Sequence, residues 1–365
     1  KAVILDGSFE NDKMGARVRD ALTTQLHLAG WKVENFPLHT IKIGNCAGDF
    51  YCWIRSPGVC NVNDDNRTIA SAIIRSDLLV YLTPVTFGGY SSVLKKAVDH
   101  QIQNISPFFA RVNGETHHQK RYRKYPNFLA LGWMDEPDAL EEVVFRHLVE
   151  RNALNMHANR AVTGVVLGDK DDGEIEALVL RCLQEMKTTV KSKAVPLPEI
   201  YPTSSRKAEI QRGVLLVGSP RTRKSTSNSL GTYLIERLEE RSIQTETIYL
   251  HTVLRSQEKI RALLDAVDAA DLVLLAFPLY VDSLPGPTIE ALERIAAHRN
   301  GRTSDQRFAA IANCGFPEAD HNLTALAISA IYSRQAGFEW AGSLALGAGE
   351  GMVHGALLNE LDGRA

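Results

Sequence analysis

The sequence predicts an α/β protein built from two similar domains, each with helices on both faces of a parallel sheet. Short apolar segments typical of buried strands alternate with amphipathic segments typical of helices along almost the whole chain. This pattern indicates parallel strands joined by helical crossovers. The segment at residues 3–8 recurs at 214–219, and the segment at 76–84 recurs at 270–278. Between the copies, residues 191–212 contain three prolines and no apolar periodicity, which is typical of a linker.

In the first copy, strands are expected where short apolar runs are bounded by polar residues or glycine. These runs lie at residues 2–6, 31–36, 77–82, 128–132 and 161–167. Helices are expected where apolar residues recur at helical spacing. These segments lie at residues 15–29, 69–76, 93–101, 138–152 and 174–191. Five such strands fit the flavodoxin-like order 2-1-3-4-5, in which the ligand lies outside the carboxyl ends of strands 1 and 3.

The second copy repeats this alternation. Its strands are expected at residues 213–217, 243–249, 272–276, 307–313 and 338–345, and its helices at about 228–240, 256–268, 285–298 and 318–336. We therefore predict two tandem flavodoxin-like domains with doubly wound, parallel, five-stranded sheets. The domains are expected at residues 1–192 and 213–365, with a linker at 193–212. The first copy has a full helix after its fifth strand and the second does not, so we expect the natural chain to continue.

Composition limits the classes of protein to which the chain can belong. Its 44% hydrophobic and 23% charged residues are typical of a globular protein, and its formal net charge of −2 argues against a nucleic-acid binder. No apolar run approaches the roughly 20 residues that span a bilayer, and the first residues resemble a strand more than a signal peptide. Five cysteines, three of them clustered, favour a reducing compartment. We expect a cytoplasmic protein without a membrane or nucleic-acid partner.

The strongest candidate for a ligand site is the turn at residues 218–229, which lies between an expected strand and an expected helix. Main-chain N–H groups at the start of a helix, with the positive end of the helix dipole, favour an anion. Hydroxyl and amide groups add neutral donors, and an arginine adds a charge suited to phosphate. The expected phosphate ligands are Ser219, Arg221, Ser225, Ser227 and Asn228. The alternative is a Ser-rich turn that only caps the helix.

Each copy has a second loop after its third strand, at the same edge of the sheet. In the first copy, residues 83–92 include Gly88 and Gly89, which let the main chain approach a flat ligand. In the second copy, residues 277–285 lack the paired glycines. The loop after the fourth strand of this copy, at residues 313–317, reaches the same edge. An ordinary turn before a helix is the alternative for residues 83–92.

These loops resemble those of a known family. The turn at 218–229 resembles the FMN phosphate loop of the NAD(P)H-dependent FMN reductases, and residues 83–92 resemble the flavin-ring loop of these reductases and of the iron–sulfur flavoproteins. The resemblance covers nearly the whole chain, twice. It implies further FMN contacts from the loops of both copies. These are Pro278, Leu279, Tyr280, Val281, Asn313 and Gly315 in the second copy, and Ser8, Pro84, Val85, Thr86, Phe87 and Gly88 in the first.

The resemblance implies an FMN-dependent oxidoreductase that takes hydride from NAD(P)H and passes electrons to a quinone, a nitro compound or a flavin. It also implies a homodimer, or a pseudo-dimer formed by the two domains of one chain. No catalytic side chain can be assigned, since the flavin itself carries the hydride. Two alternatives remain open, because fold alone does not establish function. One is a flavodoxin-type or iron–sulfur electron carrier, and the other is a non-enzymatic binding or assembly protein.

The two copies are expected to differ in their affinity for FMN. The first loop of the first copy, at residues 7–15, contains Glu10 and Asp12, which would repel a phosphate dianion. Only Ser8, Asn11 and Lys13 offset that repulsion. We therefore expect FMN to bind firmly in the second domain and weakly, or not at all, in the first. The alternative is one flavin in each domain.

A cysteine-containing segment at residues 45–60 lengthens the first copy. The segment resembles the cluster-binding segment of the iron–sulfur flavoproteins in Cys46, Cys52 and Cys60, but Asp49 stands where that family has another cysteine. We therefore expect no metal and interpret the segment as a loop of reduced thiols. An iron–sulfur cluster or a zinc ion on the three thiolates is the weaker alternative. The basic run at residues 117–124 is expected to be a solvated loop, with a site for the phosphates of NADPH as its alternative.

Overall fold

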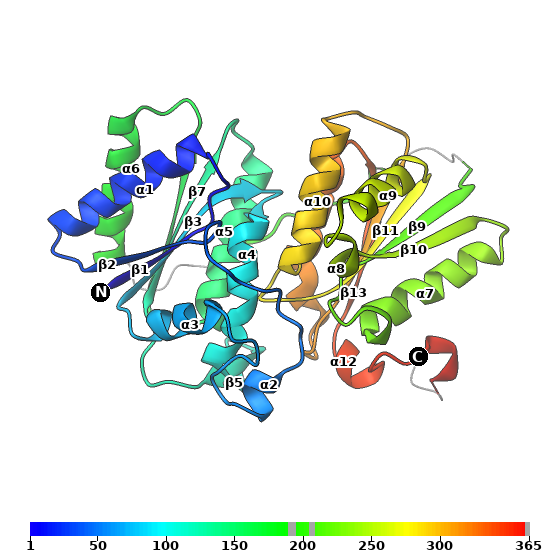
Figure 1. Cartoon of the computed structure of the whole chain (residues 1–365), viewed down its shortest axis with the longest axis horizontal. Helices are drawn as coiled ribbons and strands as arrows, with labels where there is room; N and C mark the ends of the chain where they lie inside the picture. Colours follow the sequence, from blue (N-terminus) through cyan, green and yellow to red (C-terminus); the bar gives the residue numbers. More distant parts are fainter. Residues whose placement is uncertain (189–194, 204–208, 362–365) are drawn as a thin grey trace. The chain divides into compact units, whose positions relative to one another are not determined.

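The structure is a computed structural model of the chain, and it describes residues 1–188, 195–203 and 209–361 (Figure 1). The chain divides into two compact units, Lys1–Pro196 and Leu197–Ala365. Parts of the linker expected at 193–212, and the end of the helix expected at 174–191, lie outside the described residues.

The first unit contains a sheet in which five parallel strands follow the order β2-β1-β3-β7-β8. These strands are β1 (Ala2–Asp6), β2 (Val33–Pro37), β3 (Leu78–Thr86), β7 (Asn127–Met134) and β8 (Ala161–Leu167). A sixth, two-residue strand, β4 (Gly89–Tyr90), pairs antiparallel with the end of β3. Counted along the chain, the five parallel strands have the order 2-1-3-4-5, so the predicted fold class is confirmed for this copy.

Helices cover the first sheet and close its core (Figure 1). They are α1 (Lys13–Leu28), α2 (Tyr51–Ile54), α3 (Asn66–Ile74), α4 (Ser92–Asp99), α5 (Ala139–Asn155) and α6 (Asp172–Thr188). Leu22 and Leu26 of α1 and Val179 of α6 pack against the buried side chains of the strands. Every residue of β1 is buried, as expected for a central parallel strand covered on both faces.

The polar stretch between α4 and β7 contains two strands that the sequence did not predict. After a 3₁₀ turn, η1 (His100–Asn104), it forms an antiparallel hairpin of β5 (Ile105–Val112) and β6 (Glu115–Lys120). Asn113 and Gly114 form the turn with positive φ of 52° and 89°. An Asn-Gly pair is the strongest local signal for such a hairpin. The signal was present in the sequence, but the strands on either side are too polar to stand out.

The second unit repeats the architecture, with strand order β10-β9-β11-β12-β13. Its strands are β9 (Arg212–Val217), β10 (Gln244–Tyr249), β11 (Leu272–Pro278), β12 (Arg307–Asn313) and β13 (Glu339–Leu346). Its helices are α7 (Thr226–Glu239), α8 (Leu250–Val253), α9 (Gln257–Asp268), α10 (Gly286–Arg299), α11 (Leu323–Gln335) and α12 (Gly349–Met352), with the 3₁₀ turns η2 (Thr222–Lys224), η3 (Ala319–Asn322) and η4 (Leu358–Glu360). The order is again 2-1-3-4-5, which confirms the fold class for both copies.

Candidate flavin site

Three loops of the second unit meet at one edge of its sheet because β9, β11 and β12 are neighbouring parallel strands. Val217 at the end of β9 pairs with Ala276 of β11, and Pro278 at the end of β11 pairs with Asn313 of β12. The main-chain N–H of Leu279 donates to the carbonyl of Asn313 at 2.8 Å, which joins two of the loops. The structure therefore brings together the three second-copy segments that the sequence singled out.

The loop after β9 turns tightly against α10 before α7 begins. Its first residue must be small, since a Cβ on Gly218 would lie 2.5 Å from Oγ1 of Thr288. Ser225 caps α7, because its Oγ accepts a hydrogen bond from the N–H of Asn228 at 3.1 Å and donates to the carbonyl of Thr222 at 2.6 Å. Of the five expected phosphate ligands, Ser225 therefore acts as the helix cap that the alternative interpretation describes. The other candidate ligands have different partners.

Those other side chains form a buried polar network around the start of α7. The hydroxyl of Ser227 donates to Oδ1 of Asn313 at 2.8 Å, and Oδ1 of Asn228 accepts from the hydroxyl of Tyr249 at 3.0 Å. Oγ of Ser219 accepts from the main-chain N–H of Arg221 at 3.3 Å. Ser219, Ser227 and Asn228 are all at least nine-tenths buried. The first N–H groups of a helix have no partner within the helix, so this network surrounds donors suited to an anion.

Arg221 is engaged by a residue that the sequence analysis missed. Its guanidinium forms an ion pair with Glu350 of α12, and about one third of each side chain is exposed. α12 is held beside the start of α7, since the N–H of Gly349 donates to the carbonyl of Cys314 at 2.9 Å and Oγ1 of Thr226 donates to the carbonyl of Gly349 at 3.4 Å. A free anion at this helix start would therefore compete with Glu350 for Arg221.

The loop after β11 contains a tight turn with an unusual backbone. The main chains of Tyr280 and Ser283 exchange hydrogen bonds of 2.9 and 3.1 Å. The two residues between them, Val281 and Asp282, have φ of 47° and 56°. A β-branched residue rarely adopts this left-handed conformation, and strained residues of this kind gather at functional sites. A tight turn therefore forms at residues 280–283 without the paired glycines that the first copy has in its loop.

The corresponding loop of the first unit has the same shape. Thr86 pairs with Gly89 across the turn, and Phe87 and Gly88 between them have φ of 55° and 78°. Tyr90, which follows Gly89 in this loop, is fully buried. Its ring meets the ring of Tyr81 edge-on, with the centroids 5.5 Å apart and an interplanar angle of 88°. Tyr90 is therefore part of the core.

The helix start in the first unit differs sharply from that in the second. The carboxylate of Asp12 accepts hydrogen bonds from the main-chain N–H of Gly15 at 2.9 Å and from the indole N–H of Trp133 at 3.1 Å. The hydroxyl of Ser8 donates to the buried carboxylate of Asp6 at 2.5 Å. The start of α1 thus already holds an anionic group of the chain itself. The contact of Trp133 was missed because it comes from a strand end 121 residues away.

The chemistry of the donors decides which loop fits an FMN phosphate. The loop at 218–229 offers hydroxyls, an amide, an arginine and a helix start, and its sequence contains no carboxylate. At the start of α1, in contrast, the Asp6 and Asp12 carboxylates take the donors. The residues of the second unit therefore fit a phosphate, and those of the first do not. Fold and site together define a flavodoxin-like protein whose second domain has a loop with donors suited to a phosphate.

The family follows from comparison with known proteins. A family model described as NADPH-dependent FMN reductase matches residues 1–116 and 212–346, more than half of the chain. The chain belongs to this family, and it is an FMN-dependent NAD(P)H oxidoreductase. The match includes the starts of α1 and α7 and the loops at residues 83–92 and 277–285. It favours the reductase over the electron carrier and the flavin-free binding protein.

Several solved structures are similar to parts of this chain. The NAD(P)H:quinone oxidoreductase of Methanothermobacter marburgensis is 17% identical over 38% of this chain and 87% of its own, with a TM-score of 0.31. An FMN-dependent NADH-azoreductase of Bacillus anthracis, solved with FMN, is 12% identical over 42% of this chain and 100% of its own, also with a TM-score of 0.31. No curated protein sequence matches the chain.

The three clustered cysteines lie around one small cavity of the first unit. The cavity is lined by Cys46, Cys52 and Cys60, together with His100. Burial raises the pKa of Cys46 to about 12 and that of Cys52 to about 11. Burial would also raise the pKa of Cys60, but its contact with His100 and a main-chain hydrogen bond lower it below the ordinary value. In the described ranges, no group of three or more His, Cys, Asp or Glu side chains is placed to hold a metal ion.

The basic run at residues 117–124 is not a solvated loop, because β6 takes up its first half. His117 contacts Oδ1 of Asn155 at 2.8 Å. The ring of His118 lies against that of Trp53, with centroids 4.7 Å apart, and burial lowers the pKa of His118 to about 4. Lys124 forms an ion pair with Asp77.

No described helix is long and apolar enough to cross a membrane.

Proposed function

We propose that the chain holds one FMN, in its second domain, and uses it to pass electrons from NAD(P)H to a quinone, a nitro compound or a free flavin. The observation that carries this proposal is the contrast between the two helix starts. The start of α7 presents buried hydroxyls, an amide and Arg221, whose partner Glu350 is about one third exposed, whereas the start of α1 is occupied by the Asp12 carboxylate. A phosphate dianion is repelled by carboxylates and attracted by a guanidinium.

Each loop of the second unit has its own part in this proposal. Ser219, Ser227, Asn228 and the first N–H groups of α7 bind the phosphate, and Arg221 neutralises part of its charge. The strained turn at residues 280–283 and the adjoining Asn313 position the flavin ring at the edge of the sheet. FMN supplies the hydride transfer when it is bound. The protein's own contribution is to hold the cofactor and expose one face of its ring to substrates.

Steady-state oxidation of NADH and of NADPH, with a quinone, a nitroaromatic compound and free FMN offered in turn, tests the activity. Multiple turnovers with at least one acceptor are expected. In the Arg221→Ala variant, this activity should need more added FMN and recover when FMN is in excess. Oxidation that stops after one equivalent with every acceptor would contradict the proposal and favour the electron carrier.

Oligomeric state is a separate part of the proposal. The tandem repeat makes a pseudo-dimer within one chain the first expectation, with a homodimer as the alternative. Light scattering of the FMN-loaded protein distinguishes a mass of one chain from a mass of two.

A further inference from the structure

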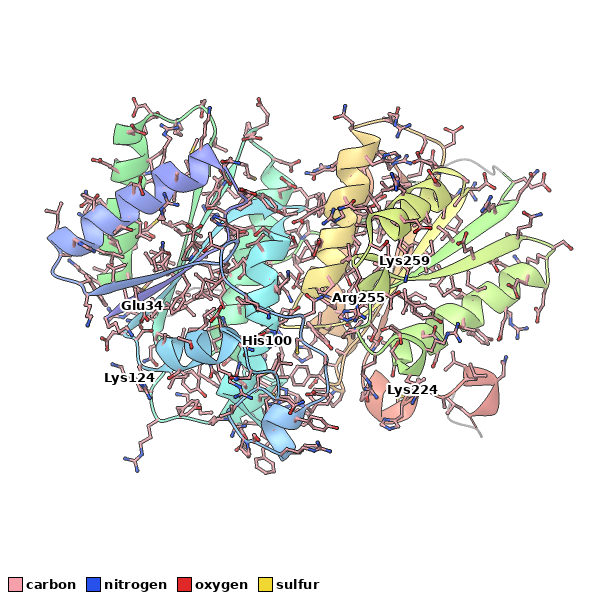
Figure 2. All side chains as sticks on the ribbon, viewed as in Figure 1. Glu34, His100, Lys124, Lys224, Arg255 and Lys259 are labelled. Carbon is pink, nitrogen blue, oxygen red and sulfur yellow. The ribbon has the colours of Figure 1, made fainter. Side chains whose placement is uncertain are left out.

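The segment around residues 44–60 places three thiols and an imidazole against one small cavity of about 20 Å³. The three thiols come from the segment itself, and the imidazole belongs to His100, at the end of α4 (Figure 2). A cavity of this size holds about one water molecule. The family function described above makes no use of this group of side chains.

The hydrogen bonds of His100 determine which of its ring nitrogens can accept a proton from a neighbouring thiol. Its Nε2 lies 2.8 Å from the carbonyl oxygen of Gly44. A carbonyl oxygen can only accept, so Nε2 carries the hydrogen atom. The other nitrogen, Nδ1, lies 3.7 Å from Sγ of Cys60. In the neutral ring Nδ1 is an acceptor, and it is therefore placed to take the proton of the Cys60 thiol.

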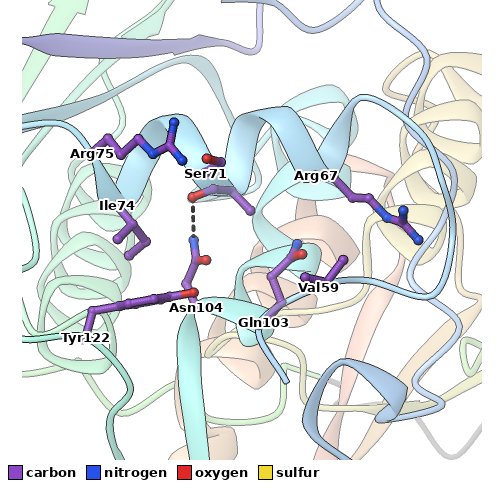
Figure 3. A pocket seen from close by; sticks show the side chains of 10 residues that line it. Val59, Arg67, Ser71, Ile74, Arg75, Gln103, Asn104 and Tyr122 are labelled. Carbon is purple, nitrogen blue, oxygen red and sulfur yellow. Dashed lines mark hydrogen bonds between the residues drawn. The ribbon is translucent and has the colours of Figure 1, made fainter. Parts of the chain in front are cut away.

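Cys60 is held in place and remains within reach of small molecules. Its N–H donates to Oε1 of Gln103 at 3.0 Å, and its carbonyl accepts from Nε of Arg67 at 2.9 Å. Gln103 and Arg67 also line a larger open cavity of about 260 Å³ beside α3, together with Val59, the neighbour of Cys60 (Figure 3). Gln103 lines both cavities. A small oxidant that enters the larger cavity therefore comes close to the half-buried Cys60.

From this geometry we propose that Cys60 is a redox-active thiol that reacts with hydrogen peroxide and then forms a disulfide with Cys52. His100 first takes the proton of Cys60. The thiolate sulfur attacks one peroxide oxygen, an S–O bond forms, and the O–O bond breaks. The departing hydroxide takes the proton from His100 and leaves as water. Cys60, now a sulfenic acid, has lost two electrons to the peroxide.

The second step joins two cysteines. The sulfur of Cys52 attacks the sulfur of the sulfenic acid, an S–S bond forms, and the S–O bond breaks. The hydroxide that leaves takes the thiol proton of Cys52, and a second water is released. Overall, two thiols and one hydrogen peroxide give one disulfide and two waters. A dithiol reductant reverses the change by exchange.

Cys52 is a better partner for Cys60 than Cys46 is. The N–H of Gly58 donates to the carbonyl of Cys52 at 2.9 Å, which folds the chain back and brings residue 60 towards residue 52. After burial, Cys60 is the side chain that raises the pKa of Cys52 most, whereas for Cys46 that side chain is Asp99. Cys46 therefore serves as the matched control.

Peptide mapping by mass spectrometry tests the proposal on the full-length, FMN-loaded protein. After one equivalent of hydrogen peroxide and alkylation of the remaining thiols, a Cys52–Cys60 disulfide is expected, while the buried Cys182 and Cys314 stay reduced. Cys52→Ser and Cys60→Ser should abolish the disulfide, and Cys46→Ser should leave it unchanged. Dithiothreitol should restore all five thiols.

The role of His100 is tested by the rate of disulfide formation. His100→Gln should slow it markedly, because without the imidazole less of Cys60 is present as the reactive thiolate. Thermal melting of this variant confirms that it is folded, and His100→Asn provides a second variant if it is not. The proposal is overturned if Cys60 stays reduced, if it pairs with Cys46, or if Cys182 and Cys314 oxidise equally fast.

Discussion

Glu350→Gln is expected to tighten FMN binding. Glu350 forms an ion pair with Arg221, the only side chain among the proposed phosphate ligands that carries a full charge. The phosphate must replace Glu350 as the partner of this guanidinium. Because about one third of each side chain is exposed, the pair is screened by solvent and is worth about 1 kcal/mol or less. Removing the competing charge should therefore lower the Kd for FMN by up to about fivefold.

The assay is a titration of the flavin-free protein with FMN at low salt, followed by flavin fluorescence. Arg221→Ala should weaken binding by about 1.5–3 kcal/mol, the scale of a hydrogen bond to a charged group. Added to Arg221→Ala, Glu350→Gln should have no further effect, because the two residues act through one pair. Glu240→Gln is the matched control, since Glu240 pairs with Arg237 at the other end of α7. Weaker FMN binding in Glu350→Gln would refute this reasoning and show that Glu350 organises the loop.

Three further predictions concern stability. Val281→Gly should raise the melting temperature by about 2–4 °C, since relief of the left-handed strain exceeds the entropic cost of glycine by about 1 kcal/mol. Gly337→Ala should destabilise the protein by about 3 kcal/mol, because φ is 73° and a Cβ would lie 1.9 Å from the carbonyl oxygen of Arg302. The third concerns acid: burial lowers the pKa of His118 from 6.5 to about 4. The unfolded chain therefore binds a proton that the folded chain excludes, and the free energy of unfolding should fall by up to about 3 kcal/mol as the pH decreases from 6.5 to 4.

Matched variants control these predictions. Val281→Ala keeps the Cβ and should gain less than the glycine variant; a lower melting temperature in Val281→Gly would contradict the strain argument. Gly315→Ala should leave stability nearly unchanged, because no atom of the described residues lies within 4 Å of its Cβ position. His118→Gln should remove part of the acid sensitivity, whereas substitution of the exposed His27 should not. Equal acid sensitivity in both histidine variants would show that His118 is not the responsible group.

Most of the fold could be predicted because buried parallel strands are continuous apolar runs. β1 was expected at the same residues that it occupies, and both sheets have the expected order. The β5–β6 hairpin was missed because its strands are polar, with buried residues confined to a few positions. Its turn residues, Asn113 and Gly114, were the one local sign of it.

The candidate site was predictable where its chemistry is local and not where it depends on distant residues. The donors at residues 219–228 lie within one turn and its following helix, so their grouping could be predicted from spacing. The contact between Arg221 and Glu350 joins positions 129 residues apart. Likewise, His100 reaches Cys60 across 40 residues. Nothing in periodicity or composition pairs such residues, because only the packed fold brings them together.

The flavin content of the full-length protein tests the central claim most directly. After saturation with FMN and removal of the unbound cofactor, flavin and protein are quantified together in the wild type and in two variants. We expect one FMN per chain in the wild type, a marked loss in Arg221→Ala, and no loss in Trp133→Phe, which removes the indole donor to Asp12 at the helix start of the first unit. Two FMN per chain, or full retention in Arg221→Ala with loss in Trp133→Phe, would contradict the assignment of FMN to the second domain.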